Sequence, residues 1–514
     1  MVCRVNTSSL LAAAAARVAT LQASLTVRDG APAKLIEIHI SWLLLGQSTA
    51  YKLKKPLRLP FLDCTTLAAR QRFCEEELRL NRRLAPSLYL DVVPICDDGH
   101  GATFGGPGEA VDAAVCMQRF PDGALWREML RAGTLAPHHV DALAQTLAAF
   151  HHDAAVAPAG SAFGSPAAHE KVLHGLRETV ATPTLAAWLE AQLATLAPWW
   201  TARQRDGRVR ECHGDLHLGN VLQLDGDAIA FDGIEFDAAL RWTDVVDDIA
   251  FLAMDLLAHD RRALAFRFLN AYFSASGDYD ALPGLRFAMV CRALVRAQVT
   301  TLAAQQGVHA VEGCDAAAYT ALAEALSRST DPRLAITHGL PGSGKSFVSQ
   351  GVLEAAGAVC VRSDVERKRL FGLDALASSR DHVPAGIYDP ATTRRTYARL
   401  QAVADTALQS GWPVIVDAAF LRHSERAAFA DLAASRRAPF AIFDCRAALP
   451  LLRQRIQLRM AAGADPSEAD LSVLEKLAGV DEPLQGMEAA AAIVADAAAM
   501  AAPESLARQW LEAA

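Results

Sequence analysis

The eight residues Gly339–Ser346 constrain this chain more than any other segment. They read GLPGSGKS and meet the pattern of a glycine, four residues, a second glycine, a lysine and a serine or threonine. Glycines let the backbone fold closely around a phosphate group, and the N-terminus of a following helix adds partial positive charge. The apolar run Leu334–His338 comes directly before the pattern and predicts the strand that such a loop needs. We therefore predict a phosphate-binding loop, or P-loop.

Each residue that defines this pattern has an expected part in binding nucleotide. Gly339, Gly342 and Gly344 are expected to shape the backbone around the phosphates. Lys345 should reach the β- and γ-phosphates and act in catalysis, and the Ser346 hydroxyl should bind Mg²⁺. The predicted cofactors are therefore ATP and Mg²⁺.

The rest of residues 334–514 predicts an α/β P-loop NTPase domain with a parallel sheet, because short apolar runs alternate with helix-length segments. The carboxyl ends of parallel strands line the ligand crevice, and Asp364 and Asp417 follow two such runs. Asp417 is expected to hold Mg²⁺ through water, and Asp364 to accept the proton of an attacking hydroxyl. The alternative for both is a helix N-cap. The predicted strands are Leu334–His338, Val359–Arg362, Val414–Val416 and Phe440–Phe443.

Two arginines follow in the segment LLRQRIQLRM. Arg455 and Arg459 are four residues apart and would share one helix face. Two guanidinium groups on one face could clamp the γ-phosphate during transfer, and would then belong to the nucleotide site. A solvated basic face is the alternative, and the sequence leaves both open.

This half resembles the P-loop kinases of the adenylate-kinase-like group, particularly the zeta-toxin and polynucleotide-kinase types. The resemblance rests on GLPGSGKS, the string SDVER, the strand VIVDAAF and the arginine segment followed by DPSEAD. It implies that Asp364 and Arg367 face the phosphoryl acceptor. It also implies that the arginine segment forms a lid over nucleotide.

A second set of motifs lies in the other half, where His213–Asn220 reads HGDLHLGN and Phe231–Asp237 reads FDGIEFD. Asp215 would orient and deprotonate an acceptor hydroxyl, Asn220 would bind Mg²⁺, and Asp232 would hold the metal that bridges the phosphates of ATP. The runs Val221–Leu224 and Ala228–Phe231 predict short strands between the two motifs.

These motifs resemble those of aminoglycoside-phosphotransferase-like kinases over roughly residues 30–320. The resemblance implies an α+β bilobal protein-kinase-like fold. It implies that Asp248, in the string DVVDDIAFLAMDL, supports the catalytic loop, while His151 is a packing residue. One departure is the loop Gly46–Thr49, which holds a single glycine where a glycine-rich loop is usual.

The small lobe supplies a predicted ATP-binding lysine in the string AYKLKK. Lys52 and Lys54 point to the same face of a strand, so either could serve, and we prefer Lys52. Its carboxylate partner should lie within Glu75–Glu77 on the next helix, where Glu77 is preferred; a solvated acidic face is the alternative. The segment Met117–Phe120 should connect the lobes and meet adenine.

The whole chain resembles bacterial fusion proteins described as bifunctional aminoglycoside phosphotransferase and ATP-binding protein. We predict one domain over residues 1–326, with a small lobe at about 30–120 and a large lobe at about 121–326. A linker at 327–333 and a P-loop kinase domain at 334–514 follow.

The bulk composition narrows the partners. The net charge of −8 disfavours a general nucleic-acid or membrane-surface binder. Ten scattered cysteines, with no CxxC pair, suit reduced thiols and a cytoplasmic protein. No stretch reaches about 18 uncharged apolar residues, so no transmembrane helix is predicted. The Ala-rich segment Ala489–Ala502 is predicted to form a packed helix.

The leading hypothesis is an ATP-dependent phosphotransferase with two sites, each moving the γ-phosphate of Mg·ATP to a hydroxyl of a small molecule. Two alternatives are that one half is a regulatory ATP-binding module, or that the C-terminal half is a polynucleotide 5′-end kinase. An aminoglycoside acceptor is not favoured, because a polycation needs an acidic pocket. Glu235 and Asp237 could contribute to one, but could equally be helix caps or structure beside the metal.

Overall fold

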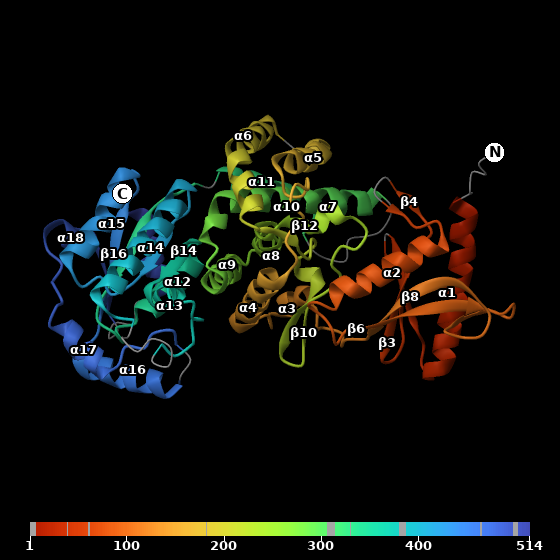
Figure 1. The fold of residues 1–514 in the computed structure, drawn as a ribbon, viewed down its shortest axis with the longest axis horizontal. Coiled ribbons are helices and arrows are strands. Elements are labelled where there is room, and N and C mark those ends of the chain that lie inside the picture. The colour runs from red at the N-terminus through yellow and green to blue at the C-terminus, as the bar shows by residue number, and fades with distance from the viewer. Residues whose placement is uncertain are drawn as a thin grey trace.

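The computed structural model describes residues 7–38, 40–59, 62–180, 182–305, 314–328, 330–379, 387–462, 465–496 and 502–513. Three parts follow one another along the longest axis of the molecule (Figure 1). A small β-rich lobe lies at one end, a helical lobe lies in the middle, and a P-loop domain lies at the other end.

The small lobe is built on an antiparallel six-stranded sheet in the order β1-β2-β3-β8-β6-β7. Helix α1 (Thr7–Asp29) covers one face of the sheet, and α2 (Leu67–Asn81) the other. The strands are β1 (Lys34–Glu37), β2 (Ser41–Leu45), β3 (Thr49–Lys54), β6 (Tyr89–Asp97), β7 (Ala102–Phe104) and β8 (Glu109–Gln118), beside a hairpin of β4 (Arg58–Leu59) and β5 (Leu62–Asp63).

Alternation along β3 decides which residues face which helix. Tyr51 and Leu53 pack with α1, whereas Ala50 packs on the side of α2. Because strand side chains alternate between faces, Lys52 and Lys54 also point toward α2. Helix α2 begins at Thr66, whose hydroxyl caps the N–H of Ala69. Strand β6, which contains Pro94 and two aspartates, is an element that the sequence pattern did not predict.

The helical lobe is a bundle around one large core. Its helices are α3 (Trp126–Ala132), α4 (Pro137–Asp153), α5 (Pro166–Leu176), η1 (Arg177–Thr179), α6 (Pro183–Arg205), η2 (Leu218–Asn220), α7 (Ala238–Arg241), α8 (Val245–Ala258), α9 (Arg262–Ser276), η3 (Tyr279–Ala281), α10 (Leu282–Gln305) and α11 (Ala316–Arg328). Its short strands are β9 (Val209–Glu211), β10 (Val221–Leu224), β11 (Asp227–Ala230) and β12 (Trp242–Asp244). The β10–β11 hairpin matches the two strands predicted between the motifs.

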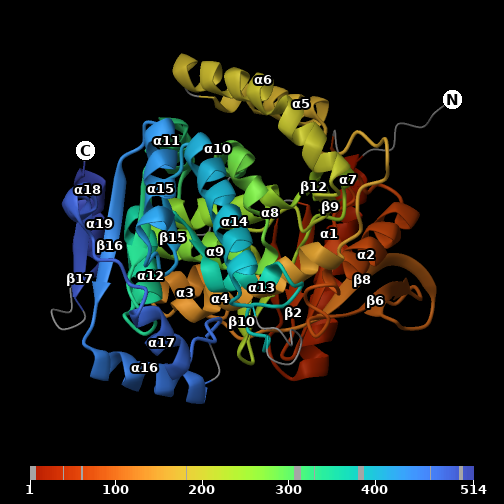
Figure 2. The same cartoon turned by 60° about the vertical axis from the view of Figure 1, so that its left-hand side comes forward.

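The P-loop domain contains a parallel five-stranded sheet in the order β14-β15-β13-β16-β17, with helices around it (Figure 2). Its strands are β13 (Leu334–His338), β14 (Val359–Arg362), β15 (Val414–Asp417), β16 (Phe440–Arg446) and β17 (Ala492–Asp496). Its helices are α12 (Lys345–Ala356), α13 (Ser363–Arg369), α14 (Pro390–Gln409), α15 (His423–Ser435), α16 (Leu449–Ala462), α17 (Leu471–Ala478), α18 (Gly486–Ala490) and α19 (Pro503–Glu512). The predicted parallel sheet is confirmed.

Strand β17 shows that the predicted helix over Ala489–Ala502 is wrong. Residues 492–496 pair with β16, while residues 497–501 lie outside the described part of the chain. Ile493 and Ala495 are buried and Val494 is exposed, which is the alternation of a strand with one covered face. Pairing with a neighbouring strand therefore outweighs the helix propensity of alanine here.

The helical lobe and the P-loop domain share one continuous hydrophobic core. The edge strand β14 lies against α9, and the Asn270 side chain pairs with its backbone. The Asn270 Nδ2 donates to Ala358 O at 2.9 Å, and its Oδ1 accepts from Cys360 N at 2.6 Å. Tyr279 Oη also donates to Cys360 O at 3.3 Å. An amide side chain thus satisfies backbone groups that an open sheet edge would leave unpaired.

Trp412 and Arg286 also form contacts between the helical lobe and the P-loop domain. Trp412 Nε1 donates to Leu282 O at 3.2 Å, and the Arg286 guanidinium lies 4.2 Å from the centre of the Trp412 ring. Arg286 also donates to Ser410 O and Gly411 O. The segment 327–333, of which residue 329 is not described, therefore joins two parts that are packed together.

Two helical stretches are long and apolar enough to cross a membrane by length and composition alone. Within the described residues they are Ser9–Asp29, which lies in α1, and Tyr279–Gln305, which includes α10. Both pack on protein: Val18 and Leu21 of α1 are buried in the small lobe, and Met289 of α10 is buried in the helical lobe.

We expect Asn270→Ala to destabilise the protein by about 1–3 kcal/mol, because buried polar groups of β14 lose their partner. The helical lobe and the P-loop domain should still unfold in one transition, measured by urea titration with tryptophan fluorescence and circular dichroism. Gln409→Ala, at an exposed position of α14, is the control and should change stability by less than about 0.5 kcal/mol. Two separate transitions in the wild-type protein would contradict the shared core.

Candidate active sites

Buried charged residues gather between β3 and α2 at the first site. Lys52 Nζ lies 2.9 Å from Glu77 Oε1, and Lys54 Nζ bonds the other oxygen of the same carboxylate. Glu77 is fully buried, whereas Glu76 pairs with Arg79 on the surface of α2. Within Glu75–Glu77, the structure therefore places Glu77 against the lysines.

The two lysines differ in their second partner. Lys52 also contacts Asp232, the aspartate predicted to hold metal, while Lys54 contacts Glu235. Burial lowers the pKa of Lys52, but the charges of Asp232 and Glu77 raise it by more. The net pKa is therefore well above its usual value, and the side chain stays charged. Of the two lysines, Lys52 is therefore the one beside the aspartate that is predicted to hold the metal.

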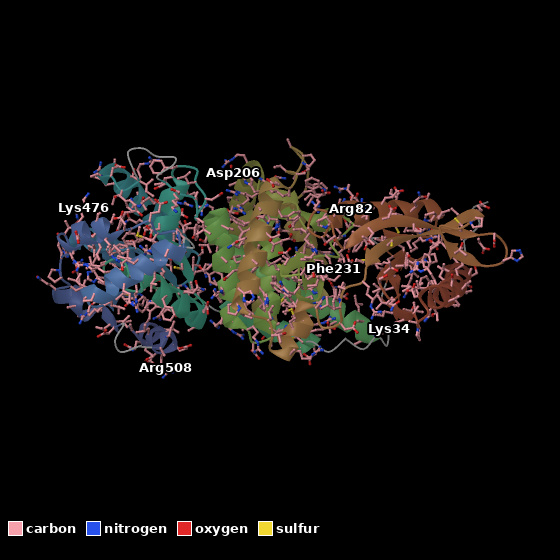
Figure 3. The ribbon with its side chains drawn as sticks, turned by 90° about the horizontal axis from the view of Figure 1, so that it is seen from below. Lys34, Arg82, Asp206, Phe231, Lys476 and Arg508 are labelled. Atoms are coloured by element: carbon pink, nitrogen blue, oxygen red, sulfur yellow. The ribbon has the colours of Figure 1, made fainter. Side chains whose placement is uncertain are left out.

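Asp232 is held in a backbone conformation that only a few residues adopt. Its φ is 62°, in the left-handed region. Its N–H donates to Tyr89 Oη at 3.1 Å, and the next N–H, of Gly233, donates to Asn81 Oδ1 at 2.8 Å. Such strain costs about 1–3 kcal/mol and is found at functional positions. Phe231, just before it, lies where the small lobe meets the helical lobe (Figure 3).

The catalytic loop brings Asp215 and Asn220 together. Asn220 Nδ2 donates to Asp215 O at 2.9 Å and to Asp215 Oδ2 at 3.0 Å. His217 Nε2 lies 3.5 Å from the same carboxylate oxygen. Burial raises the pKa of Asp215, but His217 lowers it more, with help from Arg296, so the net pKa lies below its usual value. Asp215 is therefore ionised at neutral pH, as a proton acceptor must be.

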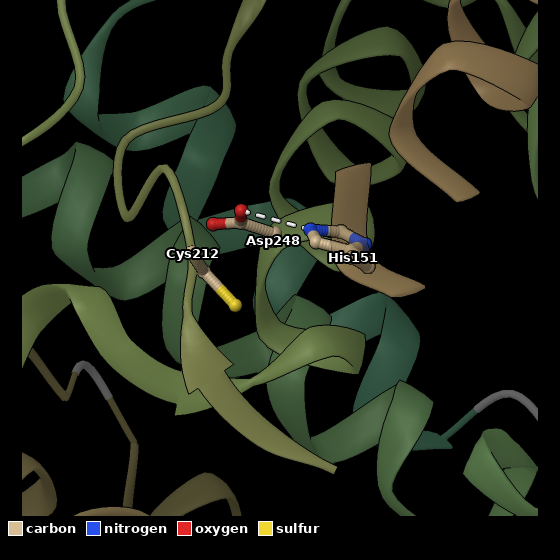
Figure 4. Close-up of side chains that lie close together, drawn as sticks. All are labelled: His151, Cys212 and Asp248. Atoms are coloured by element: carbon tan, nitrogen blue, oxygen red, sulfur yellow. Dashed lines mark hydrogen bonds and ion pairs between the residues drawn. The ribbon is translucent and has the colours of Figure 1, made fainter. Parts of the chain in front are cut away.

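Asp248 supports this loop from below, as the resemblance implied. Its Oδ2 accepts from His213 N at 2.7 Å and its Oδ1 from Gly214 N at 2.8 Å. His151 Nε2 lies 3.2 Å from Asp248 Oδ2, and His151 Nδ1 lies 2.9 Å from Tyr272 Oη (Figure 4). His151 is therefore more than a packing residue, because it positions Asp248, which in turn holds the backbone of the loop at His213 and Gly214.

Cys212 lies close enough to His151 and Asp248 for the three to form a possible metal-binding group, since one donor atom of each falls within 4.8 Å of the others (Figure 4). Sequence spacing did not indicate this group, because its members are far apart in the chain. Asp248 already binds His151 and the His213 N–H, and His151 also binds Tyr272. The Cys212 Sγ donates to Thr243 O at 3.5 Å. Burial also raises the pKa of the Cys212 thiol, which disfavours the thiolate that a metal needs. We interpret the group as a structural network.

The loop Gly46–Thr49 is held rigidly although it has one glycine. Asp29 at the end of α1 accepts from Gln47 N at 2.7 Å, and Arg119 donates to Gly46 O at 2.7 Å. A Cβ atom at Gly46 would lie only 2.4 Å from Asp29 Oδ2. No sequence pattern indicated Asp29, because its contact with the loop depends on how α1 packs.

Neither acidic residue considered for an acidic, polycation-binding pocket is free to form one. Glu235 is buried against Lys54, and Asp237 caps α7 by accepting from Ala239 N at 2.8 Å.

The segment Met117–Phe120, predicted to connect the lobes, begins at the end of β8, where Gln118 N donates to Leu88 O.

The second site is the P-loop, which runs from the end of β13 into α12. Gly339, Gly342 and Gly344 have φ values of 139°, 82° and 100°, which favour glycine. Lys345 Nζ donates to Gly339 O at 2.9 Å and Leu340 O at 3.0 Å, so it bends back over the loop. Burial lowers the pKa of Lys345.

Ser346 and Asp417 form the oxygen pair expected to bind Mg²⁺. Ser346 Oγ donates to Asp417 Oδ2 at 2.7 Å. Asp417 ends β15 and is 4% exposed, and the next helix begins only at His423, so it is not a helix cap. Hydroxyl and carboxylate oxygens are the ligands that Mg²⁺ prefers, so the donor set fits this ion.

Arg362 also lies at this oxygen pair, and the sequence pattern did not single it out. Its Nη2 donates to Ser346 Oγ at 3.1 Å, and its Nε lies 3.4 Å from Asp417 Oδ2. A basic residue at the carboxyl end of a parallel strand, two positions before Asp364, was the signal that could have indicated it.

The two residues of the SDVER string face different surroundings. Asp364 lies half-buried in the first turn of α13, and no side chain caps that helix. Arg367 is buried instead, and its Nη1 donates to Ile387 O at 3.1 Å and Thr393 Oγ1 at 3.2 Å. The resemblance implied that Arg367 faces the acceptor, but the structure places it in the packing against residues 387–393.

The arginine segment lies beside the P-loop as part of α16. Arg455 Nη1 donates to Gly342 O at 3.2 Å, and Arg459 Nη2 donates to Ala469 O at 2.5 Å. In the DPSEAD string, Glu468 lies 3.1 Å from Lys368 Nζ. Arg455 is therefore placed toward the nucleotide loop, as the clamp hypothesis expects, while Arg459 holds the segment that follows α16.

Comparison with known proteins finds relatives over most of the chain. Residues 334–484 match a family model described as an AAA domain. An uncharacterized protein of Mycobacterium tuberculosis (strain H37Rv) is 30% identical over 440 residues, which cover 84% of this chain and 86% of the relative. An uncharacterized protein of Mycobacterium bovis matches with the same identity and coverage. The chain belongs to the family of these mycobacterial proteins.

Several solved structures are similar to parts of the chain. A Plasmodium vivax ethanolamine kinase is 13% identical, covering 58% of this chain and 82% of its own, with a TM-score of 0.35. A choline/ethanolamine kinase family protein from Mesorhizobium loti is 14% identical, covering 60% and 93%, with a TM-score of 0.32. A gluconokinase from Sinorhizobium meliloti is 21% identical, covering 35% and 95%, with a TM-score of 0.24. Because these TM-scores are low, the description of the fold rests on the helices and strands of this chain and not on the similar structures. The family match over residues 334–484 agrees with the predicted P-loop domain.

We expect Lys52→Met and Lys54→Met to have different consequences. Lys54→Met leaves Glu235 buried without its cation and should cost about 3–5 kcal/mol in unfolding free energy. Lys52→Met leaves Glu77 paired with Lys54, so stability should fall less while Mg·ADP binding at the first site weakens. Urea unfolding and Mg·ADP titration, both in a Lys345→Ala background, measure the two effects. Loss of nucleotide binding with Lys54→Met at full stability would reverse the assignment.

The pH dependence of turnover at the first site follows from the low pKa of Asp215. Because the ionised form accepts the proton, ATP turnover in the Lys345→Ala background should show no acidic limb between about pH 5 and pH 7. His217→Gln removes the main group that lowers this pKa, so the acidic limb should move to higher pH. An unshifted pH–rate profile in His217→Gln would contradict the role of His217.

Ser346→Ala should make ADP binding at the second site insensitive to Mg²⁺. In the presence of Mg²⁺ we expect affinity to fall about tenfold, because a ligand of the ion is lost, whereas binding in EDTA should be unchanged. Calorimetric titration in a Lys52→Met background isolates this site. Ser346→Thr, which keeps the hydroxyl, is the matched control and should bind as the wild type does.

Proposed function

We propose that this protein is an ATP-dependent phosphotransferase with two sites, each transferring the γ-phosphate of Mg·ATP to a hydroxyl of a small molecule. One observation carries the proposal. Two separate places in the fold each combine a lysine with oxygen ligands of the kind that Mg²⁺ prefers, and each has an aspartate close in sequence to one of these residues. The first set is Lys52, Asp215, Asn220 and Asp232, supported by Glu77; the second is Lys345, Ser346, Asp364 and Asp417.

In the first site, Asp215 would accept the proton of the acceptor hydroxyl, and Asn220 would orient it through its hydrogen bond to the carboxylate. Asn220 and Asp232 would hold Mg²⁺, and Lys52 would contact phosphate. Bound Mg²⁺ supplies charge neutralisation of the phosphates during transfer. The ionised state of Asp215 supports its part as the proton acceptor.

In the second site, Lys345 and the three loop glycines would bind the phosphates, and Ser346 and Asp417 would hold Mg²⁺. Asp364 would accept the proton of the acceptor hydroxyl, because it stands at the carboxyl end of β14 beside Arg362. Arg455 and Arg459 would stabilise the charge that spreads over the transferred group, and the contact of Arg455 with Gly342 supports this for the first of them.

The proposed acceptors are small molecules rather than nucleic acids. The net charge of −8 opposes a polyanionic partner. The ethanolamine kinase and the gluconokinase mentioned above are named for small hydroxyl compounds, which is the class we propose here. The description of the chain as a fusion of an aminoglycoside-phosphotransferase-like kinase and a P-loop kinase is part of this proposal, and so is its division at residues 327–333.

A second candidate function is that one half regulates the other through ATP binding. The contacts of α13 and α14 with the helical lobe favour it. Arg369 Nη2 donates to Ser274 O, and Arg399 Nη2 donates to Gly277 O at 3.2 Å, so a movement of the helix that carries Asp364 would reach α9. In this case ATP turnover would occur at one site only.

The test compares the full-length protein with Asp215→Asn, Lys345→Ala and the combination. Each is incubated with γ-labelled ATP and a library of sugars, sugar acids, amino alcohols and nucleosides, and labelled products are separated. We expect each single variant to lose a different subset of products and the double variant to lose all. Products that survive in the double variant would refute the proposal, and loss of all products in one single variant would favour the regulatory function.

A further inference from the structure

Three arginines surround the catalytic loop of the first site. Arg296 helps to lower the pKa of Asp215, and none of the three has a proposed contact with nucleotide or acceptor. Arg292 and Arg296 are one turn apart on α10, so their side chains share a helix face. Arg127 comes from α3, which packs against η2, the short helix that ends the loop. All three are half-buried.

Arg292 is used to hold the loop. Its Nη1 donates to Gly214 O and its Nε to Asp247 O, both at 3.3 Å. Its guanidinium lies 4.9 Å from the centre of the Phe251 ring. These contacts occupy the group, so Arg292 is a positioning residue for the loop rather than a ligand contact.

Arg296 is held from behind by an aromatic ring. Its guanidinium lies 5.8 Å from the centre of the Tyr319 ring, and Tyr319 Oη donates to Asp255 Oδ1 at 2.7 Å. The other oxygen of Asp255 accepts from Leu218 N at 2.9 Å. Asp255 is therefore committed to the loop and to Tyr319. The Nε atom of Arg296 is buried and has no hydrogen-bond partner among the described residues.

Arg127 reaches the loop from the opposite element. Its Nη1 would lie 3.4 Å from a Cβ atom at Gly219, so the guanidinium lies against the loop backbone. Its Nε is also buried without a hydrogen-bond partner in the described part of the chain. Burial lowers the pKa of Arg127, Glu128 raises it, and the charges of Arg131 and Arg296 lower it further. Arg127 lies against Gly219, and the Tyr319–Asp255 pair beside Arg296 binds the adjacent Leu218, so both cations lie at the same short helix.

Burial lowers the pKa of Arg296, while Tyr319, Asp215 and Asp255 raise it, so these groups lie near the guanidinium without forming a direct ion pair. Across the described ranges, neither Arg127 nor Arg296 forms an ion pair within 4.0 Å. Glu128 accepts from Gly123 N at 2.9 Å, and Asp247 accepts from the Thr243 hydroxyl. Two guanidinium groups without ion-pair partners therefore lie beside the loop that carries Asp215, whose side chain is 35% exposed.

We propose that Arg127 and Arg296 form an anion-binding subsite, so that the acceptor of the first site is a small hydroxyl compound carrying a carboxylate or a phosphate. This inference rests on the proposed function of that site. Half-buried guanidinium groups without a counter-ion gain the most from a charge-assisted hydrogen bond to an anion. A cationic acceptor would be repelled by the same pair, and Glu235 and Asp237 are already engaged elsewhere.

The first experiment measures binding and needs no acceptor. Inorganic phosphate and malonate are titrated calorimetrically into the full-length protein carrying Lys345→Ala, with Mg·ADP saturating the nucleotide position of the first site. We expect both anions to bind, and Arg127→Gln and Arg296→Gln each to weaken binding about tenfold, because each removes a charge-assisted contact. Spermidine, a polycation, should not bind.

Matched variants separate an anion subsite from a general structural effect. Arg296→Lys keeps the charge and should retain part of the affinity. Arg508→Gln, at an exposed position of α19 in the P-loop domain (Figure 3), should leave anion binding unchanged. Affinity for Mg·ADP should differ less than about twofold among all variants, which shows that the arginines do not act on the nucleotide. Equal anion affinity in wild type and both glutamine variants, or no anion binding at all, would overturn the inference.

The second experiment tests the acceptor itself and distinguishes its two chemical forms. In the same Lys345→Ala background, sugar acids, sugar phosphates, neutral sugars and amino sugars are compared as acceptors. We expect only the anionic sets to be phosphorylated, and Arg296→Gln to raise their KM about tenfold with a smaller effect on kcat. Turnover with neutral or amino sugars alone would overturn the inference while leaving the phosphotransferase intact. If no compound is phosphorylated although phosphate binding depends on the arginines, the proposed function fails and the anion subsite stands.

Discussion

The open edge of strand β14 is the constraint on which the arrangement of this molecule depends. A parallel sheet of five strands has two edges, and the edge at β14 must satisfy its backbone groups. The amide of Asn270 and the hydroxyl of Tyr279 do so from the helical lobe, so the lobe and the sheet are parts of one core. The same strand ends at Arg362 and leads into the helix that bears Asp364. The second site is therefore built partly on the surface of the lobe that carries the first.

Electrostatics distinguishes the two sites. In the first, buried lysines and carboxylates neutralise one another: Glu77 bridges Lys52 and Lys54, and each lysine has a second carboxylate. In the second, Lys345 is bonded to loop carbonyls, and the oxygen pair of Ser346 and Asp417 is met by Arg362. Nucleotide phosphates would replace neutral partners of the lysine in the second site, but would compete with Asp232 for Lys52 in the first.

Local patterns allowed much of this to be predicted from the sequence. The P-loop, its strand and the β10–β11 hairpin depend on residues that are close together in the chain, so their spacing was informative. Alternation along β3 placed Lys52 and Lys54 on one face, but it could not separate them, because Glu77 contacts both. Whether each placed residue has its proposed role is a question for the experiments above.

The features that could not be predicted from the sequence depend on packing between residues far apart in the chain. The strand at 492–496 forms because β16 offers a partner, and an alanine-rich sequence carries no sign of that. Arg367 turns into the packing because residues 387–393 lie beside it, although the resemblance implied that it faces the acceptor. Asn270, Asp29 and Arg296 gain their importance only from elements distant in the sequence.

The central claim, two nucleotide sites on one folded core, is tested most directly by the stoichiometry of nucleotide binding. Equilibrium dialysis of the full-length protein with Mg²⁺ and a non-hydrolysable ATP analogue counts the bound molecules per chain. The structure predicts two per chain in the wild type, one in Lys345→Ala and one in Lys52→Met. A single nucleotide per wild-type chain, removed entirely by one of these substitutions, would contradict the account.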